Sequence, residues 1–186
     1  MSDWPHGWED DGKPWDELPE IDMDPDLLFR IGLFTVSWAR LEAQFDTLFP
    51  ILYKLDPTYA LTITAGLGLK ARIAMLRSAT YQIKPLLGEP TASNLLGILE
   101  DVAYFSVEWR NNLAHANYED GDAFIKITNH KELKGRFLEA SIEDFDNIIK
   151  DITELTNEIH RMIPVLIRIM RNVTAADFDR VCAFSG

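Results

Sequence analysis

Apolar side chains recur at alternating spacings of four and three residues directly after the dipeptide Asp24-Pro25. An aspartate followed by proline is a strong helix start, because the carboxylate accepts from free amides and proline suits the first helical position. The spacing predicts one long core helix of about seven turns, which Pro50 kinks or ends near its last turns. Its apolar stripe consists of Leu27, Ile31, Phe34, Trp38, Leu41, Phe45, Leu48 and Leu52.

The next stretch of the chain predicts two more helical pieces. Asp56-Pro57 repeats the start signal before residues 58–68, and residues 69–83 follow the helical period. Residues 84–90, KPLLGEP, are expected to form a linker.

A further helix is predicted after this linker, with Thr91 or Ser93 as its cap. The apolar stripe of that helix consists of Leu95, Leu99, Val102, Trp109 and Leu113. We expect one long helical element that ends in the polar sequence RNNLAHANY at residues 110–118.

The last third of the chain predicts a small β-hairpin and one long helix. Residues 123–128 and 135–140 are expected to pair around the turn NHKELK. Ser141 is expected to cap the final helix, which Pro164 bends. The inner face of that helix consists of Phe145, Ile148, Ile152, Leu155, Ile159, Met162 and Leu166. The predicted fold is mainly α: an up-down bundle of four to five helices, with the hairpin inserted before the last one.

Charge divides the chain into two parts. Residues 1–23 form an acidic tail rich in tryptophan and proline, and residues 24–186 are expected to form one helical domain. The whole chain carries a formal charge of −12, and residues 1–26 hold ten of its 30 acidic side chains. The rest of the chain, residues 27–186, is nearly neutral. This excludes a nonspecific nucleic-acid binder coated in Lys and Arg, but it allows a local basic groove. No stretch of the sequence has the roughly 18 uninterrupted apolar residues of a membrane span. The single cysteine, Cys182, is typical of a protein of the reducing cytoplasm.

The sequence GLGLKA at residues 66–71 matches a dinucleotide-binding pattern of glycines. Such a site needs a strand before the glycines and a second strand that ends in an acidic residue. No second strand is predicted before Glu89, so we favour a loop that connects two helices.

The histidines and the cysteine do not form a recognisable metal or thiol site. His6, His115, His130 and His160 share no i, i+3 or i+4 spacing, and Cys182 has no histidine close in sequence. We therefore expect no metal and no cofactor.

The sequence RNNLAHANY places several chemically active side chains where the apolar stripe ends. Arg110 carries a planar fork that suits a phosphate, and His115 can transfer protons near neutral pH. On a regular helix Asn111 lies about 40° from His115 and can orient its ring. The purely structural alternative is a helix C-terminus at which the Asn and His side chains donate hydrogen bonds to the last backbone carbonyls. The chemical alternative is cleavage of RNA without a metal, with protons moved at the ribose 2′-hydroxyl or the leaving 5′-oxygen.

RNNLAH resembles the Arg-x(4–6)-His motif of the HEPN superfamily, in which a polar residue follows the arginine. WARLEAQFDTLF and LGLKARIAML are also similar to the first and second helices of HEPN-like proteins of the abortive-infection type. The resemblance implies an all-α domain that forms a homodimer, with the two motifs facing a shared cleft.

The same resemblance implies a metal-independent endoribonuclease that acts as a toxin or an antiviral defence effector. Arg110 would contact the scissile phosphate and His115 would act as general acid and base, with Asn111, Asn112 and Tyr118 in support. The implied partners are a second copy of the chain, an RNA substrate and an antitoxin protein. The alternative is a non-catalytic HEPN-fold module that binds RNA, a nucleotide or a protein.

A toxin subgroup of this superfamily carries a longer motif, Arg-x4-His-x-Tyr. In this chain Asn117 takes the tyrosine position and Tyr118 follows one residue later. The resemblance therefore extends to the superfamily and not to that subgroup.

Overall fold

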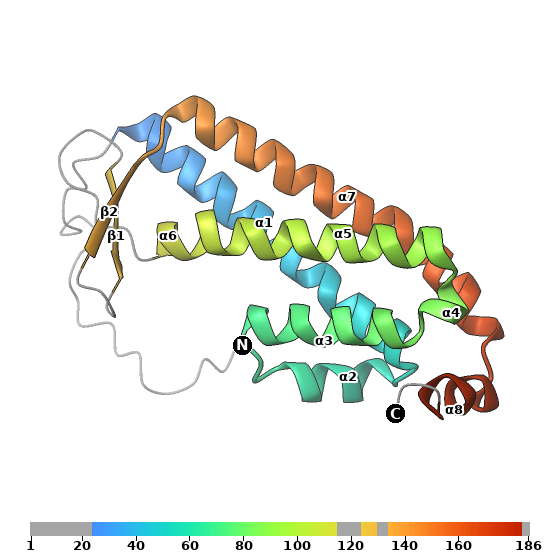
Figure 1. The fold of residues 1–186 in the computed structure, drawn as a ribbon. Coiled ribbons are helices and arrows are strands. Elements are labelled where there is room, and N and C mark those ends of the chain that lie inside the picture. The colour runs from blue at the N-terminus through green and yellow to red at the C-terminus, as the bar shows by residue number, and fades with distance from the viewer. Residues whose placement is uncertain (1–23, 115–123, 130–133, 184–186) are drawn as a thin grey trace, which may run out of the picture.

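The computed structural model describes residues 24–114, 124–129 and 134–183, which are mainly helical (Figure 1). The prediction of a mainly α-helical fold is confirmed. The elements are α1 (Pro25–Tyr53), α2 (Pro57–Thr64), α3 (Leu69–Gln82), α4 (Lys84–Leu87), α5 (Glu89–Phe105), the π-helical turn η2 (Ser106–Arg110), α6 (Asn111–Ala114), β1 (Phe124–Asn129), β2 (Lys134–Glu139), α7 (Ile142–Asn172) and α8 (Ala175–Ala183).

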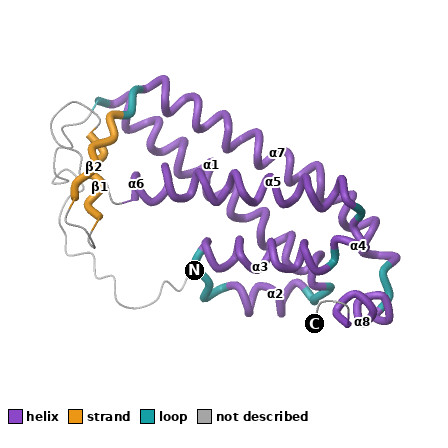
Figure 2. Tube along the Cα trace, in the orientation of Figure 1, coloured by secondary structure: helices purple, strands orange, loops and turns teal. Residues whose placement is uncertain are grey.

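The long helices α1, α5 and α7 form the body of the bundle, and α2 and α3 lie along the C-terminal half of α1 (Figures 1 and 2). The most extensive packing joins α1 to α7, and α5 packs against both α3 and α7. The core lies between these helices because each presents one apolar face to the others. The largest fully buried side chains include Leu41, Phe45, Leu76, Leu95, Leu99, Phe145, Ile152 and Ile159.

Helix α1 begins where the sequence predicts. The Asp24 carboxylate accepts a hydrogen bond from the Asp26 amide at 2.8 Å, and Pro25 occupies the first helical position. The helix continues three residues beyond Pro50 and ends at Lys54, which adopts a left-handed φ of 50°. Seven of the eight predicted stripe residues are buried, and Ile31 is partly buried against the core.

The segment predicted as a linker is mostly helical. Residues 84–87 form the single turn α4, and α5 begins at Glu89 with Gly88 as its cap, so the predicted caps Thr91 and Ser93 are wrong. Gly88 has a φ of 78°, a conformation that a side chain disfavours, and it separates α4 from α5 as the only residue between them. The Ser93 hydroxyl instead donates to the Glu89 carboxylate at 3.1 Å within the first turn.

Helix α7 is stabilised at its start by a capping box. The Asp144 amide donates to the Ser141 hydroxyl at 3.2 Å, and the Ser141 amide donates to the Asp144 carboxylate at 2.8 Å. The Ser141 hydroxyl also donates to the Asp144 carboxylate at 2.7 Å, and this bond, together with that from the Ser141 amide, lowers the pKa of Asp144 because both favour its charged form. All seven predicted inner-face residues of this helix are buried.

Replacing Ser141 with alanine is expected to lower the free energy of unfolding by about 1 kcal/mol, the usual cost of losing a cap. The Asp144 pKa is depressed in the folded state, so its contribution is present at neutral pH and is lost as the pH falls through the folded pKa. The difference between wild type and Ser141→Ala should therefore shrink on acidification. Urea unfolding at several pH values measures it, and an equal difference at all pH values would contradict this account.

Helix α8 was not predicted from the sequence. Its start repeats the same capping arrangement, since the Asp177 amide donates to the Thr174 hydroxyl at 3.3 Å and the Thr174 amide to the Asp177 carboxylate at 2.9 Å. The Lys54 ammonium donates to the Val173 carbonyl and joins the end of α1 to the α7–α8 junction. The short length of α8 leaves too few turns for a clear apolar period.

Strands β1 and β2 pair antiparallel, with Phe124 opposite Glu139 and Asn129 opposite Lys134. The connecting residues 130–133 lie outside the described part of the chain, so the hairpin as an inserted unit stays a prediction.

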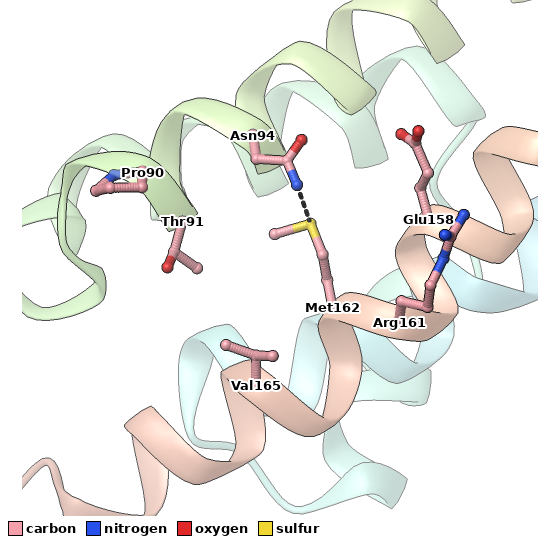
Figure 3. A pocket seen from close by; sticks show the side chains of 7 residues that line it. All are labelled: Pro90, Thr91, Asn94, Glu158, Arg161, Met162 and Val165. Atoms are coloured by element: carbon pink, nitrogen blue, oxygen red, sulfur yellow. Dashed lines mark hydrogen bonds between the residues drawn. The ribbon is translucent and has the colours of Figure 1, made fainter.

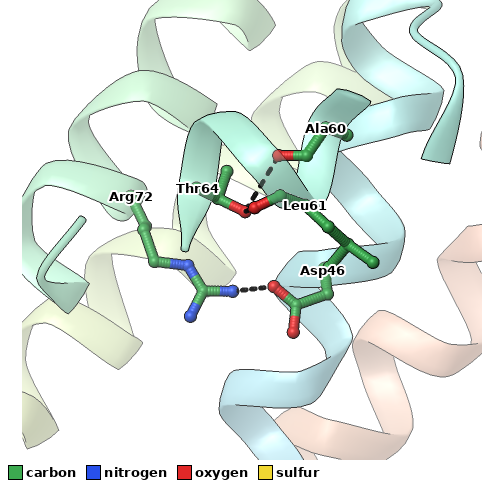
Figure 4. Close-up of polar contacts among 5 residues, drawn as sticks. All are labelled: Asp46, Ala60, Leu61, Thr64 and Arg72. Atoms are coloured by element: carbon green, nitrogen blue, oxygen red, sulfur yellow. Dashed lines mark hydrogen bonds and ion pairs between the residues drawn. The ribbon is translucent and has the colours of Figure 1, made fainter. Parts of the chain in front are cut away.

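A half-buried ion pair holds α3 against α1 (Figure 4). The Arg72 guanidinium bonds the Asp46 carboxylate and lies 5.9 Å from the centre of the Phe45 ring. Nearby in α2, the Thr64 hydroxyl donates to the Ala60 carbonyl at 3.0 Å. The Arg72 side chain is only 12% exposed, and the Asp46 carboxylate compensates its positive charge.

Replacing Asp46 with asparagine is expected to lower the free energy of unfolding by about 1–2 kcal/mol, because a hydrogen bond to a charged group is lost. The partial exposure of Asp46, 40%, keeps this cost below that of a fully buried pair. Chemical denaturation measures it, with the exposed Asp101→Asn on α5 as control. Equal stability of the two variants would show that the pair contributes nothing.

Candidate functional site

The RNNLAH motif begins at the end of a π-helical turn. Helix α5, the turn η2 and helix α6 form one continuous helical run, and η2 ends at Arg110. A π turn bonds residue i to i+5 and so inserts a residue relative to the α period; such turns are frequent at functional sites. The regular helix predicted over this segment is therefore wrong in detail at η2.

The π turn is held against the core by Trp109. Its ring meets the ring of Phe145 edge-to-face, with 6.1 Å between the centroids, and Phe145 is fully buried in α7. Trp109 and Leu113 are partly buried and pack against the core. Trp109 is thus anchored in the core, while the adjacent Arg110 lies at the surface.

Arg110 lines a groove of about 400 Å³ between the motif helix and α1. We call this the Arg110 groove. Its lining residues are Ile31, Phe34, Thr35, Trp38, Ala39, Glu42, Arg110 and Leu113. Most of these side chains are apolar, so the groove presents one cation and one carboxylate on an apolar surface.

The carboxylate of the groove already has a partner. The Trp38 indole nitrogen donates to Glu42 Oε1 at 2.5 Å, one helical turn along α1. Arg110 Nη1 donates to Asn111 Oδ1 at 3.2 Å, between adjacent residues. A guanidinium has five donors, and this contact uses one, so Arg110 retains donors for an anion.

The structure places the predicted site residues only in part. It brings Arg110 and Asn111 together at the start of α6, both exposed. Asn112 lies in α6, but its side chain is outside the described part of the structure, as are His115 and Tyr118. The pairing of Arg110 with His115 is therefore still a prediction.

Two residues of the groove were missed as site residues. The helical period places Trp38 in the core stripe of α1, and no motif of the sequence includes Glu42. The available signal was their i, i+4 spacing, which permits the indole to donate to the carboxylate. That this pair faces Arg110 depends on how two distant helices pack.

A second groove of about 450 Å³ lies between α5 and α7 (Figure 3). Its lining residues are Pro90, Thr91, Asn94, Glu158, Arg161, Met162 and Val165. The Asn94 amide lies 3.6 Å from the Met162 sulfur, and Arg161 Nε donates to the Asn157 carbonyl at 3.2 Å. No residue of the RNNLAH motif contributes to it, and its charged side chains are exposed.

The glycines of GLGLKA lie between two helices, α2 and α3, and the strand-like residues before them belong to α2. The prediction of a helix-connecting loop is confirmed. Within the described ranges, no three His, Cys, Asp or Glu side chains gather closely enough to hold a metal ion. None of the helices in those ranges combines the length and apolar content that crossing a bilayer requires.

No protein-family model, curated protein or solved structure matches this chain.

Proposed function

We propose that the protein is a metal-independent endoribonuclease of HEPN type. The observation that carries the proposal is the position of Arg110, the first residue of the RNNLAH motif. It lies exposed at the end of a π turn and lines a groove against α1. An arginine so placed has the donors and the access that a phosphate group of RNA requires.

The proposed chemistry needs one cation and one proton-transfer group. Arg110 binds the scissile phosphate and stabilises the charge that develops on it. His115, five residues later, removes the proton of the ribose 2′-hydroxyl or protonates the leaving 5′-oxygen. The 2′-oxygen forms a bond to phosphorus as the bond to the 5′-oxygen breaks, which leaves a 2′,3′-cyclic phosphate and a 5′-hydroxyl end.

The apolar lining of the groove supports a nucleic-acid substrate whose bases contact the protein directly. A base can pack on Ala39 and Leu113 while its phosphate binds Arg110. Residues 27–186 carry only a small net negative charge, so affinity must come from such local contacts and not from the field of the whole protein.

The proposal includes a homodimer in which two motifs face one cleft. It also includes a toxin or antiviral role in the cytoplasm, with an antitoxin as a further partner. Tight RNA binding without cleavage would favour the alternative, a non-catalytic HEPN-fold binding module. The apolar lining of the groove agrees with this alternative as well, since such a surface can bind a ligand without catalysis.

The test is incubation of the purified full-length protein with a mixed RNA pool in the presence of EDTA. We expect cleavage with 2′,3′-cyclic phosphate ends, and no cleavage of DNA of the same sequence, which lacks the 2′-hydroxyl. Cleavage that EDTA abolishes, or equal cleavage of DNA, would contradict the proposed mechanism.

A further inference from the structure

The second groove, between α5 and α7, has a chemistry of its own, and we call it the α5–α7 groove (Figure 3). Its volume of about 450 Å³ lies within the range of small-molecule sites, roughly 300–1,000 Å³. The two helices that line it pack directly on each other, so the core of the bundle fixes its shape. It is separate from the RNNLAH motif, which contributes no residue to it.

The charged and the apolar side chains of this groove lie at opposite ends. Glu158 and Arg161 stand together at one end, whereas Val165 lies at the other end, beyond Met162 (Figure 3). Met162 is buried and Val165 is 44% exposed, so α7 supplies an apolar floor. A ligand that fills the groove must therefore combine a charged head with an apolar body.

The two charges at the end of the groove are free to bind a ligand. Glu158 and Arg161 lie three residues apart on α7, where side chains are neighbours, yet neither forms an ion pair with any residue in the described part of the chain. Arg161 Nε donates to the Asn157 carbonyl at 3.2 Å. This bond uses one donor of the guanidinium and holds the side chain along the helix, while the outer nitrogens can bond a ligand.

Asn94 of α5 adds a carboxamide to the middle of the groove. Its amide nitrogen lies 3.6 Å from the Met162 sulfur, which is a weak acceptor (Figure 3). A ligand can replace this contact at little cost, because the carboxamide donates to a carboxylate and accepts from an ammonium. Asn94 is thus suited to a ligand that carries either group.

The balance of charge at this end disfavours a ligand that is only an anion. Glu154 lies one turn before Glu158 on α7 and is exposed, so two carboxylates neighbour one guanidinium. A phosphate or an RNA strand at Arg161 would be repelled by both. A head group with one ammonium and one carboxylate satisfies both signs, since Glu158 accepts from the ammonium and Arg161 donates to the carboxylate.

We propose that the α5–α7 groove binds a free α-amino acid with an apolar side chain. Its ammonium bonds Glu158, its carboxylate bonds Arg161 and Asn94, and its side chain packs on Met162 and Val165. An aromatic side chain suits this floor best, because a methionine sulfur makes favourable contacts with the edge of a ring. The site is independent of RNA cleavage, so the proposed function can fail without affecting it.

Binding is tested by titrating the full-length, 15N-labelled protein with L-phenylalanine and recording two-dimensional NMR spectra. We expect saturable shifts of the amide signals of Asn94, Glu158 and Val165, with a dissociation constant on the order of 0.1–1 mM for a ligand of this size. Shifts confined to other segments would overturn the proposal. Absence of saturable shifts up to about ten times that concentration would overturn it as well.

Two analogues test the requirement for both charges. Phenethylamine keeps the ring and the ammonium but lacks the carboxylate, and 3-phenylpropionate keeps the ring and the carboxylate but lacks the ammonium. We expect each to bind roughly tenfold more weakly than L-phenylalanine, because each loses a hydrogen bond between charged groups. An analogue that binds as tightly as L-phenylalanine would contradict a site for both charges.

Matched variants on α7 assign the two charges to their residues. We expect Arg161→Met to weaken L-phenylalanine binding roughly tenfold without weakening phenethylamine binding. Glu158→Gln should weaken L-phenylalanine binding to a similar extent without weakening 3-phenylpropionate binding. Arg168→Met and Glu143→Gln make the same changes at exposed positions of α7 outside the groove, and both should bind L-phenylalanine like wild type. Equal losses in the groove variants and in these controls would overturn the assignment.

Discussion

Replacing His115 with alanine is expected to slow RNA cleavage roughly 10²–10⁴-fold, the usual cost of removing a general acid or base. The reason is that no other group of the motif exchanges a proton near neutral pH. Arg110→Ala is expected to lower the rate by about 10²–10³, because the charge on the phosphate loses its cation in the transition state. Arg110→Lys should restore only part of the rate, since lysine retains the charge but not the planar fork.

Two matched controls are available on α7, where His160 and Arg168 are exposed. His160→Ala and Arg168→Ala remove the same side chains far along the sequence from the motif, and both should cleave RNA at the wild-type rate. Initial rates on a labelled RNA, with circular dichroism to check the fold, measure all five variants. A His160→Ala variant as slow as His115→Ala would contradict the assignment of the general acid and base.

Replacing Phe145 with alanine is expected to lower the free energy of unfolding by about 3–5 kcal/mol, the range for truncating a buried aromatic side chain. Phe145 is fully buried, and its ring supports the edge of Trp109 beside the π turn. The cavity left behind removes both apolar burial and this aromatic contact. Denaturant unfolding measures the loss.

Tyr81→Ala on α3 is the control for this change, since Tyr81 is 55% exposed and its truncation should cost about 0.5 kcal/mol or less. Phe145→Ala should also speed amide hydrogen exchange across residues 106–110, because the anchor of η2 is weakened. Unchanged exchange there would show that Trp109 does not depend on Phe145.

The sequence predicts those elements whose causes are local. The Asp24 cap of α1, the Asp56 cap of α2 and the Ser141 cap of α7 all depend on a side chain and amides a few residues apart. The apolar stripes of α1 and α7 are likewise visible because the helical period is regular. These features could be read without knowledge of the packing.

The features that were missed depend on contacts between distant segments. The turn α4 and the positive φ of Gly88 lie in a stretch whose composition predicts a linker. The π turn η2 has no signature in the residues 106–110 that distinguishes it from an α turn. Within it, Trp109 packs on Phe145 of α7, a contact between segments distant in the sequence.

For the candidate site, the sequence predicts individual residues of the motif but not the groove that surrounds Arg110. The motif identified Arg110 from its chemistry and its spacing to His115. The groove requires α1 to pack beside η2 and α6, so Trp38 and Glu42 could not be assigned to it beforehand. Periodicity alone places Trp38 in the core, and it is indeed buried there.

The central claim, metal-free RNA cleavage by Arg110 and His115, is tested most directly by one comparison. Wild type and His115→Ala are incubated with the same RNA in EDTA, and the initial rates of cleavage are measured. The account predicts cleavage by wild type and a rate lower by roughly 10²–10⁴-fold for the variant. Equal rates for the two proteins, or no cleavage by wild type, would contradict it.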